Sequence, residues 1–186
     1  MKLIKQSCDA NNAITLSILV PVYNEQEMLP TFHHELCKVL ANMPNHTFEI
    51  TYINDGSNDD SWLVMQQLRS NHHHVSIELL NLSRNFGKEA AMSAGLDYCT
   101  GQAVVLLDAD LQDPPELLPQ MIKAWQSGFD VVNMKRSARL GESLLKRFSA
   151  HVYYRLLDHL SDVPLQKDVG DFRLLSRRVV DQIKQL

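Results

Sequence analysis

The sequence predicts an α/β fold, with a mainly parallel β-sheet and helices on both of its faces. From residue 15 onward, short apolar runs rich in β-branched residues alternate with segments whose apolar residues recur at helical spacing. Polar and acidic residues follow directly after several of the apolar runs, as they do where parallel strands end at a ligand site. The chain has 186 residues, 45% of them hydrophobic, which suits one domain with a buried core over residues 15–186.

In the first half of the chain, two apolar runs are each followed by a segment with a helical stripe. Proline ends the first run and an Asn-Asp-Gly-Ser turn ends the second, which indicates that both are strands. Residues 59–61 offer side chains that can cap the second helix. The expected elements are strands at 15–20 and 48–53, a helix at 26–41, and a helix that carries Trp62, Met65 and Leu68.

In the second half, the same alternation continues to the end of the chain. A polar loop at 83–88 separates an alternating strand from an Ala-rich helix. Two prolines at 114 and 115 fit the first turn of a later helix, which Gly128 ends. The expected elements are strands at 75–82, 104–107 and 130–134, a turn into a short strand at 170–175, and helices at 88–98, 115–126 and 177–186.

Residues 135–155 form a strongly basic segment, with six Lys or Arg residues against one acidic residue, Glu142. Apolar residues recur at helical spacing between 144 and 160, which predicts an amphipathic helix. Two interpretations stay open: a helix packed on the core with a solvated basic face, or a surface that meets anionic lipid headgroups. The basic residues are Lys135, Arg136, Arg139, Lys146, Arg147 and Arg155.

Composition excludes several classes of function. A net charge of -4 argues against nucleic-acid binding through bulk electrostatics. The cysteines, Cys8, Cys37 and Cys99, are odd in number and widely spaced, as is typical of reduced thiols in a cytosolic protein. No apolar run approaches the roughly 20 residues of a membrane-spanning helix. Residues 1–14 are expected to be a flexible polar lead-in, and the histidines at 72–74 to be solvated rather than metal-bound.

Polar side chains follow each of the first four expected strands. Because the carboxyl ends of parallel strands meet at one edge of a sheet, and ligands bind there, we expect these side chains to lie together. They are Glu25 after the first strand, Asp55 after the second, Arg84 and Lys88 after the third, and Asp108 and Asp110 after the fourth.

Asp108 and Asp110 stand out because they follow the most apolar strand, two residues apart. In extended backbone both carboxylates point to the same side, where they repel each other. A divalent cation between them would offset that repulsion, and Mg²⁺ commonly takes one or two carboxylates together with substrate phosphates. On these residues alone, a solvated turn after a strand stays an open alternative.

Five blocks of sequence, taken together and in order, resemble the inverting glycosyltransferases of family 2, which have the Rossmann-like GT-A fold. The resemblance covers residues 15–186 and is strongest to the polyprenyl-phosphate branch, which includes dolichol-phosphate mannose synthases and, nearer still, bactoprenol (undecaprenyl-phosphate) glucosyltransferases. The blocks are residues 20–25 (Val-Pro-Val-Tyr-Asn-Glu), 54–57 (Asn-Asp-Gly-Ser), 84–88 (Arg-Asn-Phe-Gly-Lys), 108–116 (Asp-Ala-Asp-Leu-Gln-Asp-Pro-Pro-Glu) and 169–174 (Val-Gly-Asp-Phe-Arg-Leu).

The resemblance implies a hexosyltransferase that uses a nucleotide-sugar donor, with UDP-glucose as the expected donor and GDP-mannose as the alternative. It also implies a divalent metal, Mg²⁺ or Mn²⁺, that bridges the diphosphate. By position in the matching blocks, it assigns the nucleoside to Pro21, Tyr23, Glu25 and Asp55, the metal to Asp108, Asp110 and Gln112, and further donor contacts to Arg84 and Lys88.

The implied acceptor is a polyprenyl phosphate, whose phosphate oxygen attacks the anomeric carbon with inversion. A phosphate monoester is largely dianionic at neutral pH, so it needs a positive site to hold it more than it needs a base. The resemblance assigns that site to Arg136, Arg139 and Arg173. Asp171 matches the proposed base of the family, and its role as base or positioner stays open.

Relatives in this branch continue into two membrane-spanning helices, so the resemblance implies that the chain is an excised or shortened catalytic domain, soluble by itself, from the cytoplasmic side of the inner membrane. Its expected partners include an anionic membrane surface through residues 135–155, with homo-oligomerisation left open. A non-catalytic nucleotide-sugar-binding module is the main alternative. A dinucleotide-binding oxidoreductase and a sugar-nucleotide pyrophosphorylase are disfavoured because the first strand is not followed by a Gly-rich loop.

Overall fold

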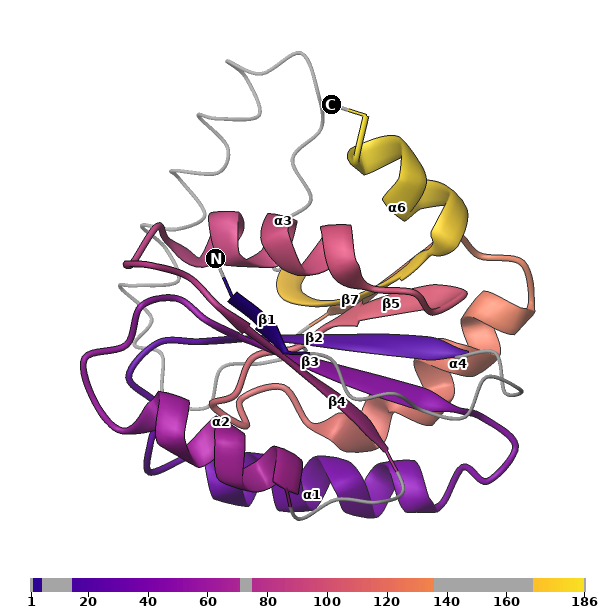
Figure 1. Cartoon of the computed structure of the whole chain (residues 1–186). Coiled ribbons are helices and arrows are strands. Elements are labelled where there is room, and N and C mark those ends of the chain that lie inside the picture. Colours follow the sequence, from indigo (N-terminus) through magenta and orange to yellow (C-terminus); the bar gives the residue numbers. More distant parts are fainter. Residues whose placement is uncertain (1, 5–14, 71–74, 136–168, 186) are drawn as a thin grey trace, which may run out of the picture. The chain divides into compact units, whose positions relative to one another are not determined.

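The computed structural model describes residues 2–4, 15–70, 75–135 and 169–185, which contain one seven-stranded sheet of order β1-β4-β3-β2-β5-β7-β6 (Figure 1). The strands are β1 (Lys2–Ile4), β2 (Leu16–Val22), β3 (Phe48–Asn54), β4 (Ser76–Asn81), β5 (Ala103–Leu106), β6 (Val131–Lys135) and β7 (Val169–Ser176). The helices are α1 (Leu29–Ala41), α2 (Ser61–Ser70), α3 (Lys88–Tyr98), the 3₁₀ turn η1 (Pro115–Leu117), α4 (Leu118–Gln126) and α6 (Arg177–Ile183).

The centre of the sheet is parallel, as predicted. Strands β4, β3, β2 and β5 run in one direction, and Leu19 of β2 pairs with Thr51 of β3 and Leu106 of β5. The strands β1 and β7 are antiparallel to their neighbours β4 and β5. Helices α1, α2 and α4 lie on one face of the sheet and α3 and α6 on the other, which confirms the prediction of helices on both faces (Figure 1). The carboxyl ends of the four parallel strands therefore meet at one edge.

The central strands are buried on both faces, which explains why their sequences are nearly continuous apolar runs. Every residue of β3 and of β5 is buried. The largest fully buried side chains include Tyr52 of β3, Phe32 of α1 and Phe172 of β7, so the core extends from the sheet into helices and from the first strands to the last.

The structure differs from the sequence-based expectations mainly at element ends. Lys2–Ile4 form the edge strand β1, where the sequence predicts only a polar lead-in, and residues 5–14 lie outside the described ranges. The first turn of the helix expected at 115–126 is a 3₁₀ turn, in which the Leu118 N–H donates to Pro115 O. Pro119 has no N–H to donate the α-helical bond to Pro115 O. The basic helix expected after residue 135 also lies outside the described residues.

By its internal contacts, the chain divides into one unit of residues 1–132 and 171–186 and a second of residues 133–170. Only the ends of β6 and β7 are described in the second unit, so the described helices and the four parallel strands all belong to the first.

Within the described ranges, no helix has both the length and the hydrophobicity needed to cross a bilayer. Cys37 and Cys99 are free thiols, and burial raises the pKa of Cys37 to about 11.

A buried carboxylate holds the amino-terminal edge of the sheet together. Glu49 of β3 accepts hydrogen bonds from the Thr100 N–H at 2.6 Å and the Thr100 hydroxyl at 2.9 Å. The Ser17 hydroxyl of β2 also donates to Glu49, and Ser17 Oγ in turn accepts from the Gly101 N–H at 2.8 Å. These bonds join β2, β3 and the turn before β5 at the edge opposite the expected site.

We predict that Glu49→Ala lowers the free energy of unfolding by about 2 kcal/mol, because the buried Ser17 hydroxyl and two partly buried donors of Thr100 lose their acceptor. Urea denaturation followed by circular dichroism measures this loss. The matched control is Glu27→Ala, since Glu27 is exposed and its loss should cost no more than about 0.5 kcal/mol. Equal stability losses in the two variants would contradict a structural role for the Glu49 network.

Candidate functional site

A pocket of about 280 Å³ opens at the carboxyl edge of the parallel strands. Its walls come from the end of β2, from the segments that follow β2, β3 and β5, and from the loop before α3 with the first residue of that helix. Seven of the residues that the sequence predicts for the site line this one pocket, together with four neighbours. The lining residues are Pro21, Val22, Tyr23, Glu25, Asp55, Asn85, Gly87, Lys88, Asp108, Ala109 and Asp110.

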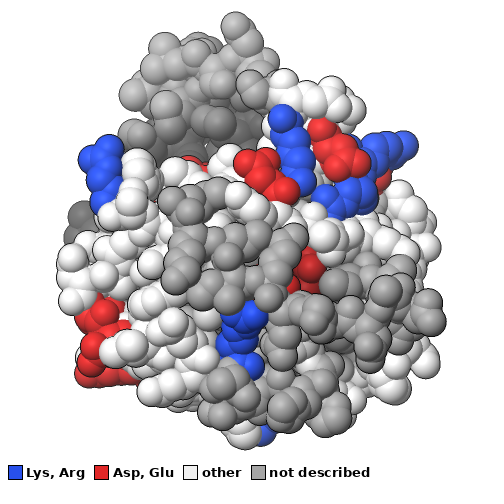
Figure 2. Space-filling model, viewed as in Figure 1, with Lys and Arg blue, Asp and Glu red and all other residues white. Residues whose placement is uncertain are grey.

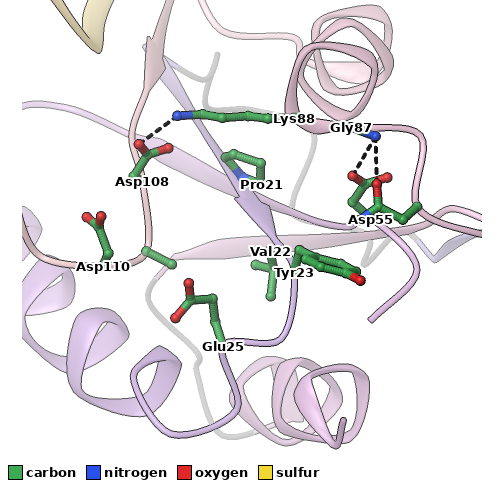
Figure 3. A pocket seen from close by; sticks show the side chains of 11 residues that line it. Pro21, Val22, Tyr23, Glu25, Asp55, Gly87, Lys88, Asp108 and Asp110 are labelled. Atoms are coloured by element: carbon green, nitrogen blue, oxygen red, sulfur yellow. Dashed lines mark hydrogen bonds and ion pairs between the residues drawn. The ribbon is translucent and has the colours of Figure 1, made fainter. Parts of the chain in front are cut away.

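The pocket has two chemically different sides. In the view of Figure 3, the carboxylates of Asp108, Asp110 and Glu25 lie toward one side, and Asp55 and the ring of Tyr23 lie toward the other. Tyr23 is 43% exposed, which is high for an aromatic side chain and leaves part of its ring available to a ligand. The arrangement suits an elongated ligand with a cation-binding group at one end and a flat group at the other.

Asp108 and Asp110 are presented by a tight turn at the end of β5. The Leu107 N–H still donates to Leu19 O at 3.1 Å, so the strand is held up to the residue before Asp108. Leu111 then adopts a left-handed backbone (φ 58°), which costs a non-glycine residue roughly 1–2 kcal/mol. In this turn, the Gln112 N–H donates to Asp110 Oδ1 at 3.0 Å and fixes the orientation of that carboxylate.

An ion pair already engages one of the two aspartates. Lys88 Nζ lies 2.6 Å from Asp108 Oδ2 (Figure 3), and both side chains are partly exposed, at 35% and 23%. Lys88 is the first residue of α3, and it follows Gly87, whose φ of 94° suits glycine. The pocket therefore contains a positive group next to its acidic side.

The acidic side of the pocket has a negative field. The pKa of Glu25 is raised above its ordinary value, first by burial and then by the charges of Asp110, Asp59 and Asp108. Such a field favours a bound cation. The described ranges hold no cluster of three or more His, Cys, Asp or Glu side chains that could bind a metal by themselves. Two carboxylates do fit the Mg²⁺ or Mn²⁺ sites that are completed by substrate phosphates and water.

The loop that carries Tyr23 and Glu25 is fastened to the loop after β3. The Asn24 N–H donates to Ser57 Oγ at 3.0 Å, and the Glu25 N–H donates to Ser61 Oγ at 2.8 Å. In return, the Asn58 N–H donates to Asn24 Oδ1 at 2.8 Å. These bonds hold Asn24 in a left-handed conformation (φ 57°), which asparagine tolerates better than most residues. The sequence identifies Ser61 as a candidate helix cap, but not its bond to the opposite loop.

Asp55 is a buried residue that fixes the loop leading into α3. It is 3% exposed, and its two carboxylate oxygens accept from the N–H groups of Phe86 at 2.8 Å and Gly87 at 2.9 Å. Gly56 (φ 66°) lets this loop approach, since a Cβ there would lie 2.3 Å from the carbonyl carbon of Arg84. Asp55 thus positions the pocket wall, a role that the sequence pattern does not predict for it.

Two predicted donor-site residues do not line the pocket. The Arg84 guanidinium lies 4.7 Å from the ring centre of Phe86, in a cation–π contact on the exposed part of the loop. Gln112 is exposed at its turn, and its backbone N–H contacts Asp110. Their predicted roles in donor and metal binding stay predictions.

The predicted acceptor residues belong to β7 and to the segment before it. Arg173 pairs in register with Leu106, near the end of β5, and is partly buried. Asp171 lies two residues earlier in β7, and because β7 is antiparallel to β5, its backbone lies toward the edge where β5 ends. Arg136 and Arg139 lie outside the described residues. Asp171 and Arg173 are thus assigned to the same edge as the pocket by backbone pairing.

Comparison with known proteins links this arrangement to one family. The model of glycosyl transferase family 2 matches residues 17–184. An uncharacterized glycosyltransferase of Synechocystis sp. is 43% identical over 173 residues, which are 93% of this chain and 54% of that protein. The bactoprenol glucosyl transferase of Shigella phage SfX is 43% identical over 174 residues, 92% of this chain and 55% of that protein. The chain thus spans about half the length of these curated relatives.

Solved structures support the GT-A fold. A mannosyltransferase from Pyrobaculum calidifontis, in complex with GDP-Man and Mn²⁺, aligns with 95% of this chain and 48% of its own, at a TM-score of 0.61 and 16% identity. Glucosyl-3-phosphoglycerate synthase from Mycobacterium tuberculosis, with Mn²⁺, UDP-glucose and phosphoglyceric acid, aligns with 89% of this chain and 58% of its own, at a TM-score of 0.61 and 18% identity. At these identities the likeness concerns the fold alone, and it confirms the predicted fold class.

We predict that Asp55→Asn loosens the pocket wall, because an amide nitrogen would face a backbone N–H that now donates to a carboxylate oxygen. The expected cost in unfolding free energy is about 2 kcal/mol. Hydrogen exchange by NMR should show faster exchange of the Phe86 and Gly87 amides, while Asp97→Asn, an exposed change on α3, leaves them unaltered. Unchanged exchange in Asp55→Asn would contradict this role.

Proposed function

The chain belongs to glycosyl transferase family 2, and from that premise we propose that its pocket binds a nucleotide-diphosphate sugar and transfers the hexose, with inversion, to a polyprenyl phosphate. The main support is the grouping of Asp108, Asp110 and Glu25 opposite Tyr23 and Asp55 in one pocket at the carboxyl edge of the sheet. Relatives 42% identical to this chain, named bactoprenol glucosyl transferase, support the choice of acceptor.

The proposed donor is UDP-glucose. Its nucleoside is assigned to the side of the pocket with Tyr23 and Asp55, where an exposed aromatic ring can stack on a base. Asp55 already accepts from two N–H groups, yet each carboxylate oxygen keeps a further lone pair for a base N–H or a ribose hydroxyl. The diphosphate is then assigned to the side with Asp108, Asp110 and Lys88.

Asp108 and Asp110 are the residues that would hold a divalent metal, Mg²⁺ or Mn²⁺, with Gln112 as a third candidate. When bound there, the metal would neutralise charge on the departing nucleoside diphosphate. Glu25 adds to the negative field at this side of the pocket, and the turn at Leu111 keeps Asp110 in place before any ligand arrives.

The reaction is one substitution at the anomeric carbon. An oxygen of the acceptor phosphate forms a bond to that carbon, and the bond to the nucleoside diphosphate breaks, which gives a glycosyl phosphodiester and a nucleoside diphosphate. The dianionic acceptor needs positive groups to hold it against the donor's charge, and Arg136, Arg139 and Arg173 are the proposed groups. Asp171 is proposed as base or positioner at the same edge.

Contact with an anionic membrane surface is proposed for residues 135–155, from their sequence. On the face shown in Figure 2, the described residues carry acidic and basic side chains side by side, most densely over α6. Mixed surfaces of this kind attract an anionic bilayer weakly. The proposed membrane attraction therefore rests on the basic segment rather than on the face of the described residues in that view.

The proposal is tested by calorimetry with UDP-glucose, GDP-mannose and UDP, each with and without Mn²⁺, followed by a transfer assay to a polyprenyl phosphate in detergent. We expect UDP-glucose and UDP to bind, about tenfold more tightly with Mn²⁺, and glucose to be transferred. Preferred binding and transfer of mannose from GDP-mannose would overturn the choice of sugar. Binding without transfer would favour a non-catalytic module, and binding of none of the three would overturn the proposal.

Substitutions should distinguish the proposed metal-binding residues from the proposed base or positioner, Asp171. We predict that Asp108→Ala and Asp110→Ala lower turnover at saturating donor at least about a hundredfold, since each removes a metal carboxylate. Asp171→Asn should also lower turnover, by about a hundredfold, but leave the Kd for UDP-glucose within about twofold. The exposed Asp97→Asn on α3 is the control and should keep full turnover. Full turnover by either metal-site variant would refute the metal role.

A further inference from the structure

The pairing of Lys88 with Asp108 points to a role for Lys88 beyond a donor contact. We propose that Lys88 is an internal counter-ion, which occupies Asp108 in the donor-free protein and transfers to the donor diphosphate when a divalent metal binds. This inference rests on the proposed function and concerns how the same pocket is loaded. Its consequence is that metal and nucleotide bind cooperatively, each weakly when alone.

The geometry creates a competition for one carboxylate. Lys88 Nζ lies 2.6 Å from Asp108 Oδ2, and both side chains line the pocket that also contains Asp110 (Figure 3). A divalent cation at Asp108 and Asp110 would lie within a few ångströms of the ammonium group, where two positive charges repel strongly. Metal binding in the absence of donor must therefore displace Lys88 or tolerate that repulsion.

The backbone of Lys88 is held in place, whereas its side chain is flexible. Its backbone follows Gly87, whose N–H is held by Asp55 Oδ2 at 2.9 Å, so the start of α3 is fixed to the sheet. Its side chain is 35% exposed and has a flexible stem of four carbons, so the ammonium can move to another partner in the pocket. The ammonium group of Lys88 can therefore move from Asp108 to a bound diphosphate without a change in the backbone.

The position of Lys88 at the beginning of α3 favours an anionic partner at all times. A helix N-terminus carries a partial positive charge, which disfavours a cation there and favours an anion. Asp108 supplies the anion in the donor-free protein. Once a metal takes Asp108, the diphosphate of the donor supplies the replacement charge to Lys88 and to the helix N-terminus. The two ligands therefore each remove an obstacle to the binding of the other.

The test is Mn²⁺ binding to the full chain without nucleotide, with free Mn²⁺ measured by electron paramagnetic resonance. Lys88→Gln should bind Mn²⁺ about tenfold more tightly than the unaltered chain, because the competitor is gone. The same variant should bind UDP more weakly, and the factor by which UDP tightens Mn²⁺ binding should be smaller than in the unaltered chain. Lys88→Arg, which keeps the charge, should bind Mn²⁺ without nucleotide as the unaltered chain does.

Two further variants make the result specific. Arg84→Gln removes one positive charge from the same loop, but its guanidinium lies over the Phe86 ring rather than at Asp108, so Mn²⁺ affinity should change less than about twofold. Lys88→Met removes the charge with a different side chain and should match Lys88→Gln, which guards against a variant that folds poorly.

The outcomes separate this inference from the proposed function. If the unaltered chain binds Mn²⁺ and UDP together but Lys88→Gln and Lys88→Met bind Mn²⁺ alone no more tightly than the unaltered chain, the counter-ion role is overturned and the proposed function stands. An equal gain in Arg84→Gln would also overturn it, because the effect would then be a general one of charge. If the unaltered chain binds neither Mn²⁺ with UDP nor UDP-glucose, the proposed function itself fails.

Discussion

The repulsion among Asp108, Asp110 and Glu25 is the constraint on which the rest of the site depends. These carboxylates meet in one pocket because parallel strands bring their carboxyl ends to a common edge. The pKa of Glu25 is raised first by burial and then by the charges of Asp110, Asp59 and Asp108. Lys88 offsets part of that repulsion by pairing with Asp108, and the Gln112 N–H donates to Asp110 Oδ1 in the turn that follows. A bound cation would reduce the repulsion among these carboxylates, so the pocket favours cation binding.

The buried and partly buried carboxylates of this protein divide by how their oxygens are used. Glu49 accepts three hydrogen bonds at the amino edge of the sheet, and Asp55 accepts two backbone N–H groups at the carboxyl edge, so both serve mainly to fasten chain segments. Asp110 accepts a bond from its own turn, and Asp108 accepts one from Lys88. Carboxylates thus fasten chain segments at both edges of the sheet, and at the carboxyl edge they also line the pocket.

Much of this fold could be predicted from the sequence because its signals are local. The helix predicted at 88–98 has the same bounds in the structure, since a glycine and a polar loop precede it and its alanines favour helix. The edge strand Lys2–Ile4 escapes prediction, because three residues carry no periodicity and their pairing with β4 is non-local. In the site, the residues that come together could be predicted, because they follow the ends of parallel strands, which meet at one edge of the sheet. The partners of Asp55 and Lys88, which lie 20 or more positions away, follow only from how the loops fold back on one another.

The division of the chain has a consequence for how its proposed parts can act. Every residue that lines the pocket belongs to the unit of residues 1–132 and 171–186, whereas Arg136 and Arg139, proposed for the acceptor, belong to residues 133–170. The bonds that shape the pocket, at Asp55, Asn24, Glu25 and Asp110, also join residues of the first unit to one another. Because these bonds lie within the first unit, we expect the proposed nucleotide-sugar donor to be able to bind before the proposed acceptor.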